Sequence, residues 1–412
     1  MSGGETSPRP PLWPAYLATY TFMVGGWAAS IAVPLHVVLL GGSLAEAGLL
    51  ASIRFGLQAF LQLPFGAVTD AWGTRRVMLI ATLGNALVNL IPLLAVVGDT
   101  TVPYYAWAVL SGVTASLFLP STGAYIAVSA PAESRGSAFG WLTLFTHTGV
   151  ATGPAIGGLV WDAGGPVPTY LVATLLGLSA IIGPLFVPRS ARQRIHISRL
   201  PGMVAEVARQ RAIVGTWLAA LAIGLPWGAL AGLFPLFGTG IGLAAGTVGL
   251  LLATQSLANG ASRVPLGRLI DRRSIPPVVA AATAAGYGAV ICLLGFQTSI
   301  PALVAIMVIG VVMLAFTLMM VQVTISEVAR PELRATGLGG YGTALSAGLA
   351  IGPFVAGGVA DAAGFGWAFG VIGVIGVSVA FLAAVVLGGS RRDRRSPPGA
   401  GPEAEETTAT SG

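Results

Sequence analysis

Residues 66–76 read Gly66-Ala-Val-Thr-Asp70-Ala-Trp-Gly73-Thr-Arg75-Arg76 and form a polar turn after a long apolar run. A shorter relative of this turn, Gly267-Arg-Leu-Ile-Asp271-Arg272-Arg273, comes later in the chain. Gly66 and Asp70 lie 201 positions before Gly267 and Asp271. Because one polar turn occurs twice at a fixed spacing, the sequence predicts a duplicated architecture with two matching joints.

The composition is that of a polytopic membrane protein. The chain of 412 residues is 55% hydrophobic, with a mean hydropathy of +0.83. Soluble proteins carry about 25% charged residues, whereas only 9% of the residues are charged here. The single cysteine, Cys292, excludes an intrachain disulfide and a cysteine metal cluster. We expect neither a metal nor a cofactor.

Twelve apolar segments reach the length of about 20 residues that a membrane-spanning helix needs. They are 13–39, 45–66, 77–97, 103–128, 137–161, 166–187, 212–237, 246–267, 276–296, 301–326, 335–359 and 366–388. We therefore predict an all-α membrane protein with 12 transmembrane helices in two pseudo-symmetric six-helix bundles. The predicted divisions are a disordered N-terminal tail (1–12), two bundles (13–187 and 212–388), a cytoplasmic linker (188–211) and a disordered C-terminal tail (389–412).

The arginines predict the orientation in the membrane. If both termini are cytoplasmic, 20 of the 21 basic residues lie in inside segments or near inner helix ends. The outside loops then hold the acids Glu46, Asp99, Asp162 and Asp361 and no base. This distribution follows the positive-inside rule and predicts a multi-pass protein of the plasma (inner) membrane. The net charge of +6 therefore does not indicate a nucleic-acid partner.

A run rich in glycine and proline also occurs twice. It contains Gly149, Gly153, Pro154, Gly157 and Gly158, and again Gly348, Gly352, Pro353, Gly357 and Gly358. Small residues four apart let two helix backbones touch, and a proline kinks a helix and frees a carbonyl group. The run predicts a close, bendable helix contact in each half, and the alternative is ordinary membrane packing.

These motifs resemble those of the major facilitator superfamily across nearly the full length of the chain. Residues 66–76 resemble the family's loop 2–3 signature, and residues 149–158 resemble the helix 5 signature of its antiporter (efflux) branches. The resemblance implies two bundles, alternating access, a central cavity and a cytoplasmic gate. The gate residues would be Gly66, Asp70, Gly73, Arg75, Arg76, Gly267, Asp271 and Arg272. The arginine that drug/proton antiporters carry in helix 4 is missing from residues 103–128, and Ser274 replaces the glycine in the second turn.

Each half also carries a polar stripe on one helix face. The stripe is Arg54, Gln58 and Gln62, and 201 positions later Gln255, Asn259 and Arg263. Residues spaced by four share a face, and a charge in mid-membrane is costly and normally faces a cavity or a partner. We predict that both stripes face the central cavity and that Arg54 meets an anionic or polar substrate group. The alternative is a structural Arg54 that bonds to carbonyl groups or to Glu46.

Three more residues complete the predicted cavity. His147 is a candidate for proton coupling, because the helix interiors contain no obvious acid, and the alternative is a packed neutral imidazole. Ser346 occupies the repeat position that matches His147. Trp27 would form an aromatic wall for an apolar substrate, and the alternative is core packing.

We predict a secondary-active transporter that exports a small amphipathic or drug-like compound by alternating access, with proton antiport as the candidate coupling. The alternatives are a proton-coupled importer of a small organic anion or metabolite, and a non-transporting membrane sensor. No nucleophile–base pair, metal-ligand cluster or ATP-binding motif occurs in the sequence, so we expect neither an enzyme nor an ATP-driven pump. The expected partners of this monomer are the lipid bilayer, a small-molecule substrate and, for coupling, protons.

Overall fold

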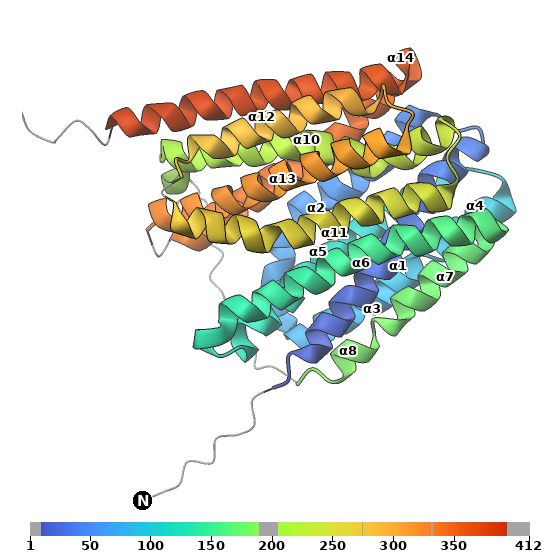
Figure 1. Cartoon of the computed structure of the whole chain (residues 1–412). Coiled ribbons are helices and arrows are strands. Elements are labelled where there is room, and N and C mark those ends of the chain that lie inside the picture. Colours follow the sequence, from blue (N-terminus) through green and yellow to red (C-terminus); the bar gives the residue numbers. More distant parts are fainter. Residues whose placement is uncertain (1–9, 189–204, 274, 331–332, 394–412) are drawn as a thin grey trace, which may run out of the picture.

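The computed structural model describes residues 10–188, 205–273, 275–330 and 333–393, which form helices and no strand (Figure 1). Most of the predicted linker, both predicted tails over 1–9 and 394–412, and Ser274 lie outside the described residues. Eight helical stretches of the described part are long and apolar enough to cross a membrane. The prediction of an all-α membrane protein is confirmed, and the count of 12 crossings stays a prediction.

The described helices follow the predicted segments closely. They are α1 (Trp13–Leu39), α2 (Leu44–Trp72), α3 (Thr74–Val88), α4 (Ile91–Gly98), α5 (Val102–Ser129), a 3-10 turn (Ala132–Ser134), α6 (Arg135–Gly164), α7 (Pro166–Ser179), α8 (Ile182–Leu185), α10 (Arg211–Gly240), α11 (Ala245–Arg272), α12 (Val278–Leu294), α13 (Ile300–Val328) and α14 (Arg334–Asp393). α3 with α4, and α7 with α8, each cover one predicted segment. α14 covers two predicted segments, which form two helices that meet at the non-helical Gly364, and the second of them continues past the expected end at 388.

Prolines mark where several helices begin. Pro14, Pro92, Pro103, Pro166 and Pro301 each stand at the first or second helical position. A proline is well tolerated there, because its missing N–H has no partner inside the helix and its fixed φ suits the helical backbone. The sequence thus specifies helix starts without side-chain caps at these positions.

The turns at one end of the molecule repeat along the chain. Gly41 and Gly242 have φ of +82° and +88°, and Gly165 and Gly364 have φ of +74° and +84°. Glycine adopts this region readily because it has no Cβ. The members of each pair are 201 and 199 positions apart, so both halves reverse direction at matching places. Gly73, between α2 and α3 at the other end, also has a positive φ of +86°.

Helix contacts repeat in the same way. α1 packs against α6, α2 against α5, and α3 against α5 and α7; in the second half α10 packs against α14, α11 against α13, and α12 against α13 and α14. The most extensive contacts between the halves are α6 with α11, which lie side by side in Figure 1, and α2 with α14. We call the two joining contacts the seams. We call the end that carries the α2–α3 and α11–α12 turns the arginine-rich end, and the end that carries the four glycine turns the opposite end.

Candidate functional site

A central cavity of about 220 Å³ lies between the two halves. Its walls come from α1, α2, α5 and α6 on one side and from α10, α11, α13 and α14 on the other. Six of the eight predicted cavity residues line it, namely Trp27, Arg54, Gln58, His147, Gln255 and Asn259. Gln62 and Ser346 do not line it, and Ser346 is buried in the packing around α14. The two polar stripes therefore meet in one space, except at their ends, Gln62 and Arg263.

Aromatic rings surround the guanidinium of Arg54. Its Cζ atom lies 5.7 Å from the ring centre of Trp27, 5.8 Å from that of Phe55 and 5.5 Å from that of Trp107. Cations within about 6 Å of a ring centre are attracted to its face. None of the residues that line the cavity is an acid. Arg54 is thus held by apolar and aromatic groups in a space without a counter-charge.

Glu46, the alternative partner of Arg54, is bonded elsewhere. Its Oε1 accepts a hydrogen bond of 3.1 Å from the Tyr105 hydroxyl. Within the described part of the chain, no ion pair joins Arg54 to an acid, and the ion pair that is seen links Arg330 to Glu206 at 3.4 Å. The geometry gives no support to an Arg54–Glu46 pair.

Two buried donors near Arg54 have no acceptor among the described residues. They are Nδ2 of Asn85 on α3 and Nε1 of Trp107 on α5, and each side chain is 3% exposed. Trp107 also lines a space of about 30 Å³ that borders Arg54. Sequence reasoning missed both residues. The signal for Asn85 was an amide inside an apolar run, whereas the indole of Trp107 reads as core packing.

A side cavity of about 440 Å³ adjoins the central one at His147, which lines both. The side cavity is also lined by Arg263, Ser137, Gly140 and Gly260. These residues come from the half of α6 and of α11 that is nearer the arginine-rich end. Arg263 Nε donates to Asn259 Oδ1 at 3.3 Å, so the amide of Asn259 bridges the two spaces. His147 stands where the central cavity widens toward the arginine-rich end.

At the opposite end, a carboxylate closes each seam. Asp162, near the end of α6, accepts hydrogen bonds from the backbone N–H groups of Ala245 (3.0 Å) and Gly246 (2.7 Å) in the first turn of α11. Asp361 in α14 accepts the equivalent bonds from Leu44 and Ala45 in the first turn of α2, both at 2.8 Å. The first N–H groups of a helix lack partners within it and carry partial positive charge, so a carboxylate there is stabilising.

Deeper in each seam, a proline carbonyl meets a glycine. A Cβ added to Gly249 would collide with the carbonyl oxygen of Pro154, and one added to Gly48 would collide with that of Pro353. Gly158 likewise faces the carbonyl oxygen of Ala245 without room for a side chain. The glycine–proline runs therefore place backbone against backbone across both seams.

The other glycines of these runs pack within each half. Gly149, Gly153 and Gly157 face α1, and Gly348 and Gly352 face α10. A Cβ added to Gly153 would stand 2.7 Å from the Cβ of Trp27, which is too close for a real side chain. The interval of four thus gives the close helix approach that small residues allow.

The predicted gate residues lie at the arginine-rich end. A Cβ on Gly66 would meet no described atom within 4 Å, so Gly66 is not at a close helix contact in this conformation. Asp70 forms no hydrogen bond or ion pair with the described residues, and partial burial raises the pKa of its carboxyl group. Arg75 and Arg76 stand in the first turn of α3, and Arg272 in the last turn of α11.

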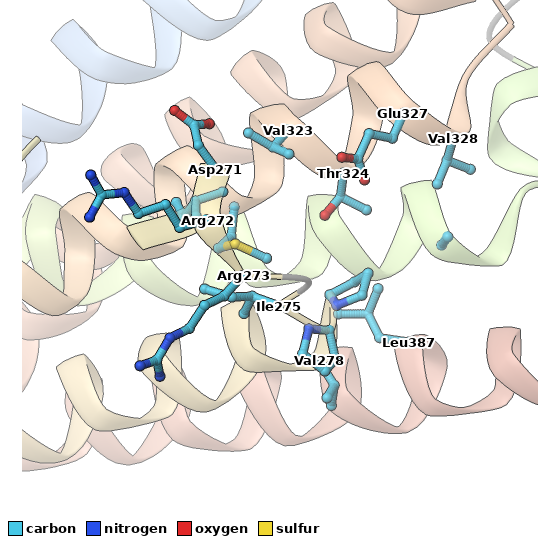
Figure 2. Close-up of a pocket in the computed structure, with 15 residues that line it drawn as sticks. Asp271, Arg272, Arg273, Ile275, Val278, Val323, Thr324, Glu327, Val328 and Leu387 are labelled. Atoms are coloured by element: carbon cyan, nitrogen blue, oxygen red, sulfur yellow. The ribbon is translucent and has the colours of Figure 1, made fainter. Parts of the chain in front are cut away.

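Asp271 and Arg272 border a hollow of about 680 Å³ at the arginine-rich end of α10, α11, α12, α13 and α14. Figure 2 shows the guanidinium groups of Arg272 and Arg273 pointing away from Glu327 and Thr324. This hollow is larger than the central cavity. It is lined by residues of the second half alone, whereas binding sites in duplicated transporters lie at the repeat interface. We therefore assign the candidate site to the central cavity.

Comparison with known proteins identifies the family. Residues 15–215 and 216–411 match the family model described as Major Facilitator Superfamily. The chain belongs to the major facilitator superfamily. This membership confirms the resemblance seen in the two motifs, and it places the chain among multi-pass membrane transporters rather than enzymes.

Two curated relatives match part of the chain. Multidrug resistance protein MdtG of Enterobacter lignolyticus (strain SCF1) is 26% identical over 258 residues, which cover 58% of this chain and 59% of that protein. Multidrug efflux pump Tap of Mycobacterium tuberculosis (strain ATCC 25618 / H37Rv) is 28% identical over 215 residues, which cover 50% and 51%. The chain thus spans between half and three-fifths of the length of these relatives.

Solved structures share the fold over nearly the whole chain. A bacterial homologue of the human lysosomal transporter Spinster, in an inward-facing and occupied conformation, has a TM-score of 0.75 at 14% identity, covering 94% of this chain and 98% of that one. A point mutant of the nucleoside transporter NupG has a TM-score of 0.72 at 14% identity, covering 92% and 99%. At this identity, the likeness concerns the fold alone.

Proposed function

We propose that this protein is a secondary-active exporter that moves a small amphipathic compound through the central cavity by alternating access. The observation that carries the proposal is the asymmetry of the seams. Both seams are closed at the opposite end by a carboxylate on a helix N-terminus, whereas a side cavity leads from His147 toward the arginine-rich end. A cavity that is closed at one end and continued at the other is what one of the two states of an alternating-access transporter requires.

The proposed topology has 12 spans in bundles of residues 13–187 and 212–388, with the linker 188–211 and both termini in the cytoplasm. The positive-inside rule supports it, since the arginine-rich end is then cytoplasmic. In this orientation the central cavity is continued toward the cytoplasm and closed toward the outside. A compound would enter from the cytoplasm in this conformation.

Export, rather than import, is supported by the relatives named as a multidrug resistance protein and a multidrug efflux pump. The glycine–proline run that resembles the antiporter signature supports the same direction. His147 is the proposed proton site, because it is the titratable side chain shared by the central and side cavities. The missing helix 4 arginine means that any proton coupling would differ from that of drug/proton antiporters.

Transport into inverted membrane vesicles tests this proposal. In such vesicles the cytoplasmic face points outward, so an exporter accumulates its substrate inside. We expect uptake of small amphipathic compounds to rise when the vesicle interior is made acidic and to fall when a protonophore is added. Vesicles from the same cells without the protein are the control. Uptake only by right-side-out vesicles would instead indicate an importer, and no flux in either orientation would indicate a sensor.

A further inference from the structure

We propose that the substrate is an organic anion, whose negatively charged group binds in a pocket of donors formed by Arg54, Asn85 and Trp107. This inference rests on the proposed function, in which the central cavity holds the transported compound. It adds the charge of that compound, which neither the family nor the names of the relatives supply.

Arg54 carries a charge that no described acid balances. The guanidinium lies among three aromatic rings and lines a cavity whose walls contain no acid. A cation removed from water is stable only when it is paired or hydrogen-bonded. Cation–π contacts offset part of this penalty, but they leave the five N–H donors of the guanidinium available. An anion in the cavity would supply the missing acceptors.

Two buried donors without acceptors lie close to Arg54. A Cβ added to Gly26 would lie 3.8 Å from Arg54 Nη2 and 3.6 Å from Asn85 Oδ1. Both side chains therefore lie close to the same point beside Gly26. The ring centre of Trp107 lies 5.5 Å from Arg54 Cζ, and the Nε1 of Trp107 has no acceptor among the described residues. Buried donors without acceptors are rare in folded proteins. Two of them next to an unpaired arginine point to an absent acceptor.

The remaining walls of the central cavity indicate what the rest of the ligand is. Beyond Arg54 the cavity is lined by Phe22, Trp27, Trp227, Leu252 and Val311, which favour a flat apolar body. Its volume of about 220 Å³ lies below the range of about 300–1,000 Å³ that is typical of pockets for drug-sized ligands. The chemistry therefore fits a compact aromatic carboxylate. An organic cation would meet Arg54 without any acid to pair with.

Binding measurements on the full-length protein in lipid nanodiscs test this inference without requiring transport. The probes are 2-naphthoate, its neutral isostere 2-naphthamide and the cation 2-naphthylmethylammonium, titrated by calorimetry at neutral pH. We expect naphthoate to bind at least about tenfold more tightly than the amide, because hydrogen bonds to a charged group are the strong ones. We expect no measurable binding of the cation.

Variants assign the preference to the donor pocket. Arg54→Gln should bring naphthoate and naphthamide within about twofold of each other, whereas Arg54→Lys should keep part of the preference. Arg268→Gln removes the same charge from an exposed position on α11 and should leave the preference intact. If Arg54→Gln fails to fold, Trp107→Phe keeps the arginine and should weaken naphthoate binding by about tenfold while sparing the amide.

Several outcomes would overturn the inference. They are equal affinities of the wild-type protein for naphthoate and naphthamide, and a naphthoate preference that survives both Arg54→Gln and Trp107→Phe. A third such outcome is that chloride alone binds through Arg54 and naphthoate does not compete with it. Titrations in chloride and in methanesulfonate would detect this outcome. Selective naphthoate binding without vesicle transport would remove the exporter proposal but keep the anion site. Transport of neutral or cationic compounds only would keep the exporter proposal but remove the anion site.

Discussion

Asp162 Oδ2 accepts a hydrogen bond of 2.7 Å from the backbone N–H of Gly246, and this bond joins the end of α6 to the start of α11 across a seam. Asp361 repeats the relationship with the start of α2. Each carboxylate uses both oxygens on a partner in the other half. All four bonds join the two halves at the opposite end, so we predict that the two aspartates act as its latch.

Loss of both caps should open the opposite end. Asparagine keeps one acceptor but loses the charge, and removal of a helix cap costs about 0.5–2 kcal/mol. We therefore expect Asp162→Asn with Asp361→Asn to lower the ratio of closed to open conformations by about tenfold or more. Val102 and Thr298 are exposed positions at this end, one in each half. Double electron–electron resonance between spin labels at these two positions would report longer distances.

The labelled protein needs Cys292 replaced, and Asp99→Asn provides the control. Asp99 is an acid at the same end whose backbone adopts φ of +48°, which asparagine also tolerates. This substitution removes a charge without touching a seam, so the label distances should not change. A distance distribution in the double Asp variant that matches the unsubstituted protein would show that the caps do not hold the seams.

Side chains added to the seam glycines should destabilise the protein. Gly249→Ala and Gly48→Ala each place a Cβ against a proline carbonyl, and overpacking of this kind costs about 1–3 kcal/mol. We expect each variant to lower the Tm of the purified protein by several degrees. Gly358→Ala is the matched control, because its Cβ would meet no described atom within 4 Å. A Tm of Gly249→Ala equal to that of the control would contradict the contact.

Much of this arrangement follows from sequence spacing. The interval of four placed Arg54 and Gln58 on one face, and the repeat of 201 positions brought Gln255 and Asn259 to the same cavity. Gln62 shares that face, but it stands about 12 Å from Arg54 along a helix with a rise of 1.5 Å per residue. A small cavity does not extend that far, so the periodicity gave the face of Gln62 and not its depth.

The contacts between halves could not be predicted in this way. Asp162 and Asp361 were visible only as acids in outside loops, because their partners are backbone groups more than 80 positions away. Asn85 and Trp107 were missed for a related reason. Their proposed role depends on α3 and α5 packing around the one arginine of α2, and helical periodicity within a single segment does not indicate which neighbour it faces.

Asp70 should give the wild-type protein a pH dependence that Asp70→Asn lacks. Asp70 lies beyond the apolar span Leu44–Gln62, and burial raises the pKa of its carboxyl group above the ordinary value of about 3.9. A raised pKa means that the fold favours the protonated form, so stability is lost as the pH rises through the raised pKa. Between acid and neutral pH, the Tm of the wild type should therefore fall more than the Tm of Asp70→Asn. Parallel curves for the two proteins would contradict this.

Proton coupling through His147 is tested by the pH dependence of transport. His147 lines both the central and the side cavity, so a proton on it could move between the substrate space and the arginine-rich end. Glutamine keeps the polarity but does not titrate between about pH 5 and 8, as histidine does. We expect uptake by inverted vesicles containing His147→Gln to become insensitive to an imposed pH gradient.

The control for His147 is Thr146→Val in the same cavity wall. The Thr146 hydroxyl donates to the carbonyl of Leu142 at 2.8 Å and does not titrate in this range. This variant should shift the KM for the substrate while it keeps the response to the gradient. If His147→Gln responds to the gradient as strongly as Thr146→Val does, then the proton does not pass through His147, and the coupling has to be sought among the acids at the helix ends.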